Sequence, residues 1–358
     1  MKSIVQTTPG DALSLTVGNV PLPEPGPREV LIRVFCAALN RMDLLQAAGK
    51  YPVPAGASEV LGVEISGTIV SMGEECSCGF EVNESVMALI SGGGYAEFCI
   101  ADERCLMRCL PGMEAPRAAS IPEAFMTAYQ LCFFVGKCQP GESVLLHAAA
   151  SSVGQAAIQM LIRKGIKVFA TVRSEAKRYR CMELGATAAI VLSDGVSFAN
   201  WVIEQNEGKR INAVLDPVGH NYLQENIEVL DFDGRLVSYG LMSGGGVTDP
   251  MFMNKLLAKR LTITASTLRS RSVEYKEKLI KELSNDPDGL PAIASGDIKV
   301  IVDRTYEMND VLAAHEMMRK NENIGKIVLL ITSTASAIDF FKKELNSLGK
   351  RNNLSMNN

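Results

Sequence analysis

Hydrophobic and polar positions follow two different patterns along the chain. From residue 1 to about 120, short apolar runs such as VLIRVFCAAL and GVEISGTIV are separated by turn residues, which is typical of a β-rich domain. From residue 142, strand-like and helix-like segments alternate, beginning with SVLLHAA and SSVGQAAIQMLIRKG. Six candidate strands separated by helices predict a doubly wound parallel sheet. The pattern therefore predicts an α/β protein with two domains.

The segments after about residue 270 are too few for a third domain. They comprise the polar helix SVEYKEKLIKELS, the strand IKVIVDRTYEM, a further helix and the strand GKIVLLI, and we expect them to return to the first domain. The predicted division is a β-rich substrate domain at 1–124, completed by 285–331, and a dinucleotide-binding domain at 125–284. Residues 332–358 are expected to form a tail whose one amphipathic piece, IDFFKKELNSL, docks on the body or binds a partner.

Composition narrows the class of protein. The 358 residues carry a net charge of -4, which disfavours a nucleic-acid binder because phosphate contacts need gathered lysine and arginine. The N-terminus lacks the features of a signal peptide, and no stretch approaches the length of a membrane span, so we expect a cytoplasmic protein. Nine cysteines without a repeated CxxC pair indicate reduced thiols. The spacing of Cys99, Cys105 and Cys109 does not match a four-ligand zinc loop, so we expect buried thiols and no metal.

A turn of small residues follows the first strand of the alternating region. The sequence AASSVGQAAIQM opens a helix there, and exposed backbone amides at such a helix start can bind a pyrophosphate. The glycine-rich fingerprint is degraded, because Ala149, Ser151 or Ser152 stand where glycines are expected and only Gly154 remains. On this spacing alone, an ordinary strand-to-helix turn is an equal alternative.

The end of the next strand, KVFATV, is basic. Arg173 and Lys177 lie four residues apart at the start of a predicted helix, with Ser174 between them, and together they suit the 2′-phosphate of NADP. NADPH is therefore preferred over NADH, although Glu175 leaves a ribose-binding role open. Further strand ends at LDPVGH, which contains Gly219, and VSYGLMSGGG are candidate walls for the nicotinamide half. The three histidines, His147, His220 and His315, are isolated and expected to be structural.

Several longer stretches resemble one family. They include ALNRMDLLQAAGKYPVPAGASEVLGVEISGTI, AASIPEAFMTAYQL, HAAASSVGQAAIQM, DGRLVSYGLMSGGG and NENIGKIVL. The sequence is similar to the medium-chain dehydrogenases/reductases, specifically the zinc-independent quinone oxidoreductases, and within them to the tumour-suppressor-inducible quinone oxidoreductase-like group. The resemblance covers the chain up to residue 331. It implies a GroES-like substrate domain, a Rossmann domain, and a cleft between them for NADPH and substrate.

The resemblance also implies roles for individual residues. Those around the nicotinamide and substrate are Asn40, Tyr51 and Thr127. The pyrophosphate is expected at Ser152 and Val153, and the 2′-phosphate at Arg173, Ser174 and Lys177. The nicotinamide wall is expected to include Gly219, Tyr239, Gly240, Leu241 and Leu268, with Lys326 reaching the cofactor from the returning segment. Two positions depart from the family: Ser152 replaces a glycine, so the turn is expected to be slightly displaced, and Leu192 replaces a tyrosine that helps to hold the adenosine phosphate.

The expected chemistry needs no metal. Asn40 and Val63 replace the Cys and His that hold catalytic zinc in the zinc-dependent relatives, and SGGGYAEF replaces their four-Cys lobe. A quinone or an α,β-unsaturated carbonyl suits such a site, because the conjugated system itself delocalises the charge left by hydride transfer. Tyr51 and Asn40 are the candidates for polarising the acceptor oxygen; alternatively, Asn40 only fixes a loop and Tyr51 only packs on the nicotinamide.

Three functions stay open at this point. The first is NADPH-dependent quinone reduction, the second is NADPH-dependent enone or alkenal reduction, and the third is NADPH binding with little turnover. A homodimer is the family expectation, with the strand LTITAS as the candidate pairing edge.

Overall fold

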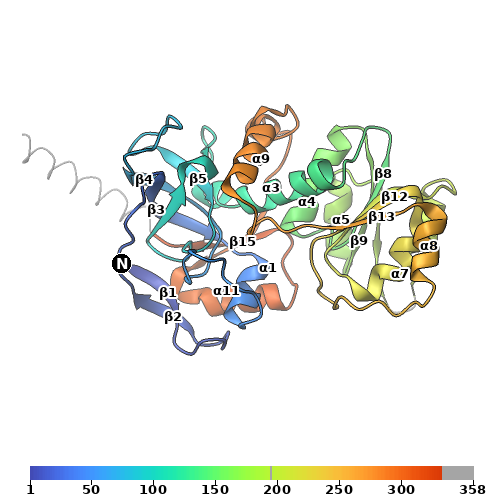
Figure 1. Cartoon of the computed structure of the whole chain (residues 1–358), viewed down its shortest axis with the longest axis horizontal. Coiled ribbons are helices and arrows are strands. Elements are labelled where there is room, and N and C mark those ends of the chain that lie inside the picture. The colour runs from blue at the N-terminus through green and yellow to red at the C-terminus, as the bar shows by residue number, and fades with distance from the viewer. Residues whose placement is uncertain (194–195, 333–358) are drawn as a thin grey trace, which may run out of the picture.

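Two β-sheets, one in each half of the molecule, organise the chain (Figure 1). The computed structural model describes residues 1–193 and 196–332. The segment predicted as a tail, apart from residue 332, lies outside the described residues.

The first sheet is built from the N-terminal third of the chain and its far end. Its seven strands are β3 (Glu29–Ala38), β4 (Glu64–Met72), β5 (Ser85–Leu89), β6 (Phe98–Asp102), β7 (Leu106–Arg108), β14 (Val302–Glu307) and β15 (Lys326–Leu330). Their order is β14-β15-β3-β4-β5-β7, and β6 also pairs with β3. A separate hairpin pairs β1 (Lys2–Gln6) with β2 (Leu15–Asn19). The pairing of β15 with β3 brings residue 326 beside residue 40.

Short helices accompany this sheet. They are α1 (Arg41–Ala47), the 3-10 turn η1 (Glu103–Cys105), α2 (Ala115–Ala118), the 3-10 turn η3 (Met308–Asp310) and α11 (Val311–Arg319). Three cysteines singled out by their spacing lie here: Cys99 and Cys105 are buried and Cys109 is half-buried.

The second sheet has six parallel strands in the order β10-β9-β8-β11-β12-β13. They are β8 (Ser143–Leu146), β9 (Lys167–Val172), β10 (Ala188–Val191), β11 (Ile211–Asp216), β12 (Leu230–Ser238) and β13 (Thr262–Ala265). Numbered along the chain, this is the order 3-2-1-4-5-6 of the doubly wound dinucleotide fold. The predicted α/β class and parallel sheet are confirmed, and β13 forms one edge.

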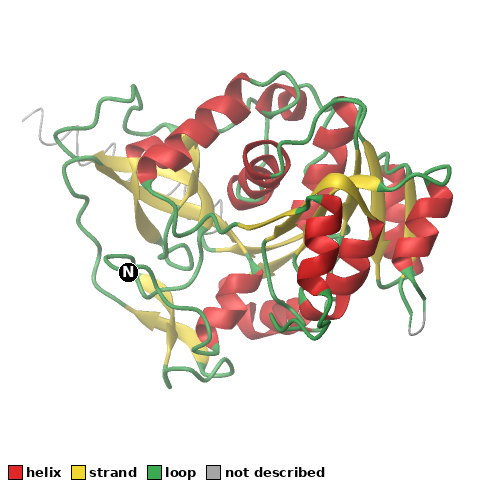
Figure 2. Cartoon of the chain, turned by 45° about the vertical axis from the view of Figure 1, so that its right-hand side comes forward, coloured by secondary structure: helices red, strands yellow, loops and turns green. Residues whose placement is uncertain are grey.

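Helices cover this second sheet and fill the space between the two sheets (Figure 2). They are α3 (Pro122–Tyr129), the π-helical segment η2 (Gln130–Val135), α4 (Ser152–Arg163), α5 (Glu175–Glu183), α6 (Phe198–Gln205), α7 (His220–Val229), α8 (Phe252–Lys259), α9 (Val273–Asn285) and α10 (Leu290–Ala294). One buried apolar cluster joins Met87 of β5 to α3, α4 and Leu146 of β8, so the two halves share a core. Within the described ranges, every helix is too short or too polar to cross a membrane.

Candidate functional site

The site begins at the point where the strand order of the parallel sheet reverses, between β8 and β11. In open α/β sheets ligands bind beyond the carboxyl ends of the strands at this point. His147, which follows β8, contacts Thr171 Oγ1 (2.8 Å) and Asn226 Oδ1 (2.7 Å), and Asn226 donates to Asp216 at the end of β11 (2.9 Å). Burial lowers the pKa of His147. This buried chain of contacts fixes the strand ends, which gives His147 the structural role that was expected.

The turn from β8 into α4 has the shape of a phosphate-binding turn although it lacks most of the glycines. Ala148 takes a left-handed conformation (φ 49°) that glycine adopts at no steric cost. Ser151 caps α4 by accepting from the Gly154 amide at 3.1 Å. A Cβ on Gly154 would lie 2.5 Å from the Ala149 carbonyl oxygen, so this one glycine is required for the helix to approach the strand. Ser152 and Val153 are half-buried at the helix start, where free amides face an incoming anion.

A small cavity connects this turn to the first sheet. Its lining includes Ser152 and Gln155 of α4, Ala124 of α3, Lys299 and Lys326. Two residues that sequence reasoning assigned to the cofactor, Ser152 and Lys326, therefore face one space although they come from different sheets.

A cluster of three cations lies at the end of β9. Ser174 caps α5 through the Lys177 amide, and the Lys177 ammonium donates to the Asn321 carbonyl. Arg41, at the start of α1, donates to the side chain of the same Asn321. Burial and then the positive charge of Arg173 lower the pKa of both Arg41 and Lys177. Among the residues that the structure describes, no ion pair involves Arg41, Arg173 or Lys177.

The predicted nicotinamide wall divides into two parts. Gly219 has a φ of 86°, and a Cβ there would lie 2.5 Å from the Gly244 carbonyl oxygen, so the LDPVGH and LMSGGG loops touch. Tyr239 and Gly240 are half-buried in this region, whereas Leu241 is 61% exposed. Leu268 is buried in the shared core and Leu192 packs partly against the core beside β10. The loops are thus adjacent, while Leu268 and Leu192 contribute to packing.

The reaction end of the cleft is a buried polar network, which we call the Asn40 network: Asn40, Glu64 and Lys326. Lys326 forms an ion pair with Glu64 and donates to Asn40 Oδ1 at 2.7 Å. Asn40 Nδ2 donates to the same Glu64 oxygen at 2.9 Å and to the Ala38 carbonyl at 3.4 Å. The amide of Asn40 is therefore fully engaged, which favours the interpretation that it positions other groups.

Asp43 holds the backbone next to this network. Its carboxylate accepts hydrogen bonds from the backbone amide of Asn40 (2.7 Å), the Tyr95 hydroxyl (3.1 Å) and the backbone amide of Gly62 (3.2 Å). Burial raises the pKa of Asp43 to about 6, against the lowering effect of these hydrogen bonds. The loop that carries Asn40 is thereby held in one position.

A second buried carboxyl lies next to the network. Glu123, on α3, donates its backbone amide to the free oxygen of Glu64 (2.8 Å), and its own Oε1 accepts from the Thr127 hydroxyl at 3.1 Å. Its other oxygen, Oε2, is buried without a hydrogen-bond partner in the described structure. Burial, and then the negative charge of Glu64, raise the pKa of Glu123 to about 7.

Tyr51 and Arg269 lie next to each other at the reaction end. Tyr51 is half-buried, and the Arg269 guanidinium lies 5.5 Å from the centre of its ring. Arg269 follows β13, yet it donates to the Ser91 carbonyl (2.7 and 2.9 Å) and to Gln46 (2.8 Å) in the first half of the chain. Arg269 thus ties the two halves together beside Tyr51.

Sequence reasoning missed Arg41, Glu64, Glu123 and Arg269. Each stands inside a stretch that carried the resemblance, such as GVEISGTI, IPEAF or TASTLRSR, so the stretches were noticed while these residues were not. Their roles depend on partners far along the chain, which composition and periodicity do not reveal.

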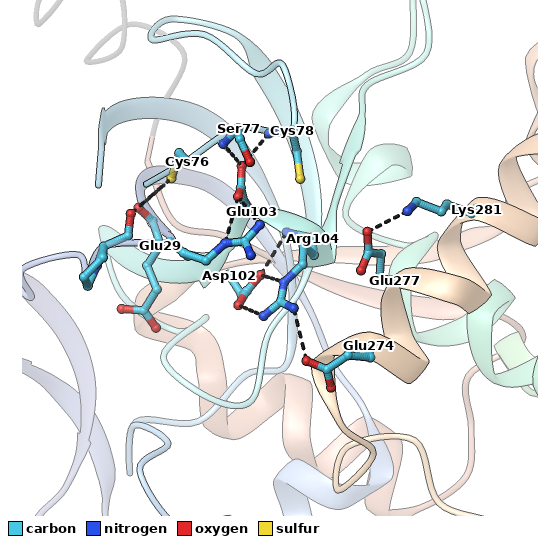
Figure 3. Close-up of polar contacts among 12 residues, drawn as sticks. Glu29, Cys76, Ser77, Cys78, Asp102, Glu103, Arg104, Glu274, Glu277 and Lys281 are labelled. Atoms are coloured by element: carbon cyan, nitrogen blue, oxygen red, sulfur yellow. Dashed lines mark hydrogen bonds and ion pairs between the residues drawn. The ribbon is translucent and has the colours of Figure 1, made fainter. Parts of the chain in front are cut away.

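A larger cavity lies away from this site, between β7, η1 and the helices α9 and α10, with a volume of about 470 Å³. In Figure 3, four charged residues of its lining, Glu103, Arg104, Glu277 and Lys281, each have a polar partner. Glu103 binds Arg28 and the amides of Ser77 and Cys78, Arg104 binds Asp102 and Glu274, and Lys281 binds Glu277. None of the residues that the sequence analysis assigned to cofactor or substrate lines this cavity, whereas Ser152 and Lys326 line the smaller one.

The residues at the strand ends fit a dinucleotide with an additional phosphate. The start of α4 supplies amides for a pyrophosphate, and no ion pair among the described residues neutralises the cation cluster, although the negative charge of Asp303 acts on Lys177. A β-rich half and a 3-2-1-4-5-6 sheet, with such a cleft between them, define a two-domain dehydrogenase or reductase.

Comparisons with known proteins agree with this class. Residues 26–112 match the model of the alcohol dehydrogenase GroES-like domain, and residues 152–285 match that of the zinc-binding dehydrogenase. A quinone oxidoreductase from Pseudomonas aeruginosa is 31% identical over 311 residues, which are 86% of this chain and 92% of that protein. The chain therefore belongs to the quinone oxidoreductase family of medium-chain dehydrogenases/reductases.

Other relatives extend the comparison. A highly-reducing polyketide synthase from Aureobasidium melanogenum is 32% identical over 86% of this chain, and the chain spans only 14% of the length of that synthase. A mycobacterial protein solved in complex with NADPH superposes with a TM-score of 0.82 at 28% identity, covering 92% of this chain and all of that one. The CurK enoyl reductase superposes with a TM-score of 0.80 at 25% identity, covering 92% of this chain and 99% of that one.

Proposed function

We propose that the chain is an NADPH-dependent quinone oxidoreductase that transfers hydride without zinc. The observation that carries the proposal is the Asn40 network: a buried ammonium, amide and carboxylate lie beside the pyrophosphate turn. At this place the zinc-dependent relatives hold their metal with Cys and His. The Lys326 ammonium against Asn40 Oδ1 opposes a second cation, and Val63 is a buried hydrophobic residue without a ligand atom.

The residues of the chain would divide the work as follows. Reduced nicotinamide, when bound, supplies a hydride. Ser152, Val153 and the start of α4 bind the pyrophosphate, and the Asn40 network fixes the wall against which the ring lies. Tyr51 donates a hydrogen bond to the acceptor oxygen, where negative charge develops as hydride arrives. Arg269 beside the Tyr51 ring favours a developing anion and excludes water from that side.

The preference for NADPH rests on the cation cluster. Arg41 and Lys177 both donate to Asn321, and the positive charge of Arg173 lowers the pKa of both, after the larger effect of burial. A 2′-phosphate would offset this repulsion. Glu175, which could have bound an NADH ribose, instead pairs with Arg178 (2.6 Å). The pairing supports an NADPH preference because it engages the first acidic residue after β9.

An enone or alkenal is the second candidate acceptor. The likeness to an enoyl reductase favours it, since both acceptor classes take hydride into a conjugated system. The same residues would serve either acceptor.

A homodimer through β13 is part of the proposal. This edge strand is largely exposed, with Ile263 at 39%, and exposed apolar side chains lie nearby on α8, among them Met253 at 69% and Leu257 at 81%. Pairing of two β13 edges would cover both the free strand and these side chains.

The test is an assay of absorbance at the reduced-nicotinamide band. Purified protein receives NADPH or NADH with ortho-quinones, para-quinones and enones, with and without a chelator. We expect chelator-insensitive oxidation, faster with NADPH than with NADH, and fastest with a quinone. Faster enone turnover would select the second candidate, and NADPH binding without oxidation by any acceptor would leave a cofactor-binding protein.

A further inference from the structure

Two glutamates share the buried space at the reaction end, and their surroundings are unequal. Glu64 is neutralised by Lys326, and its oxygens also accept from Asn40 Nδ2 and the Glu123 amide. Glu123 is 5% exposed, contacts no cation among the described residues, and has one oxygen without any partner. A buried carboxylate that has no counter-ion and only one side-chain hydrogen bond is disfavoured, so burial favours the protonated form of Glu123.

The contacts of Glu123 identify the neighbouring group that its proton can reach. Thr127 lies one helical turn further along α3, and its hydroxyl contacts Glu123 Oε1 at 3.1 Å. The negative form of Glu123 adds to the larger effect of burial in raising the pKa of Tyr51, and it opposes the larger effect of burial that lowers the pKa of Arg269. Glu123, Tyr51 and Arg269 are therefore electrostatic neighbours.

We propose that Glu123 is the proton reservoir of the reduction and that the Thr127 hydroxyl relays its proton to the reduced acceptor. The inference rests on the proposed function, which supplies the hydride donor and the conjugated acceptor. Within this scheme Thr127 gives its proton to the acceptor oxygen, to which Tyr51 also donates a hydrogen bond, and Glu123 acts through Thr127.

The step balances as follows. The acceptor takes a hydride, and with it two electrons, from the reduced nicotinamide, which leaves negative charge on the conjugated oxygen. The Thr127 O–H bond breaks and a new O–H bond forms on that oxygen, while Glu123 passes its proton to the Thr127 oxygen. A hydroxyl can rotate between donating and accepting, so one contact serves both directions. After product leaves, water returns a proton to the Glu123 carboxylate.

The expected pH dependence follows from the charges around Glu123. Burial and Glu64 favour the protonated form, while Lys326 of β15, the Thr127 hydroxyl and Lys276 of α9 favour the ionised form. Tyr51 and Arg269 border the same space. Because the protonated form is the active one, kcat should be constant below a pH of about 7 and fall as pH rises through it.

Glu123→Gln is the decisive variant, because it keeps the shape and removes the proton. We expect kcat at pH 6 to fall at least about 100-fold and to lose its pH dependence, while NADPH binding, measured by cofactor fluorescence, stays unchanged. Thr127→Val should show the same loss, and Thr127→Ser should recover most of the activity. Infrared spectra should show a carboxylic-acid carbonyl band that titrates near pH 7 in the wild type and is absent from E123Q.

Glu103→Gln is the matched control. Glu103 is another buried glutamate, but hydrogen bonds from the Cys78 amide, Arg28 and the Ser77 amide outweigh its burial and hold its pKa low, so it has no proton to give. E103Q should keep the wild-type pH profile and carbonyl band. Wild-type kcat in E123Q, or no titrating band assigned to Glu123, would overturn the relay alone. If none of the acceptors supported oxidation of NADPH by the wild-type protein, both the proposed reaction and the relay would be overturned.

Discussion

Charged side chains are paired with one another at one end of the cleft and lack ion-pair partners among the described residues at the other. At the reaction end, one lysine, two glutamates and an amide contact one another, and the Asn40 network is complete without a ligand. At the phosphate end, Arg41 and Lys177 meet at Asn321 with the charge of Arg173 nearby, and no ion pair within the described ranges neutralises these cations. The first end is therefore preorganised by its own contacts, and we propose that an anion completes the second.

This difference predicts what mutations at each end should change. A buried charge that loses its partner destabilises the fold, whereas a cation without an ion-pair partner that loses a ligand contact mainly weakens binding. Changes at the reaction end should therefore be visible in unfolding experiments, and changes at the phosphate end in cofactor titrations.

Lys326→Met should have the largest effect on the free energy of unfolding. It leaves Glu64 buried without its counter-ion, which costs about 3–5 kcal/mol in comparable pairs. The double variant with Glu64→Gln should be less destabilised than K326M, because it removes both charges. Urea unfolding measures both variants. Lys281→Met, at an exposed surface pair, is the control, and a K326M protein as stable as K281M would contradict the contrast between the two ends.

Arg41→Met should have the next largest effect, on cofactor affinity. Loss of one charge-assisted phosphate contact is expected to raise the Kd for NADPH about 10- to 100-fold and to leave the Kd for NADH unchanged. Fluorescence titration of the reduced cofactors measures both constants. Arg178→Met is the matched control, because Arg178 lies near the cluster on α5 but pairs with Glu175. Equal loss of NADH and NADPH binding in R41M would show that Arg41 does not contact the 2′-phosphate.

The fold and part of the site could be predicted from the sequence. Alternating strand and helix segments predicted the parallel sheet, although not the order of its strands. The strand ends at Arg173 and Gly219 were predicted to line the cofactor site, because ligands bind at strand ends. Arg41 was missed because nothing in its sequence neighbourhood marks a phosphate contact; the cluster forms only when α1 meets α5 and Asn321. Glu123 was missed for a similar reason, since its significance lies in the absent partner of a buried oxygen, a property of packing.

Ser151→Ala should have the smallest effect. It tests binding of the pyrophosphate, which NADH and NADPH share, separately from binding of the 2′-phosphate, which NADPH alone carries. Removing the cap of α4 is expected to lower the free energy of unfolding by about 1 kcal/mol. Because the pyrophosphate is common to both cofactors, the affinities for NADH and NADPH should fall together, unlike in R41M. Ser272→Ala removes the equivalent cap of α9, away from the turn, and should lower stability alone. If S151A and S272A bound both cofactors equally well, the start of α4 would not be the pyrophosphate site, and the phosphate end would reduce to the cation cluster.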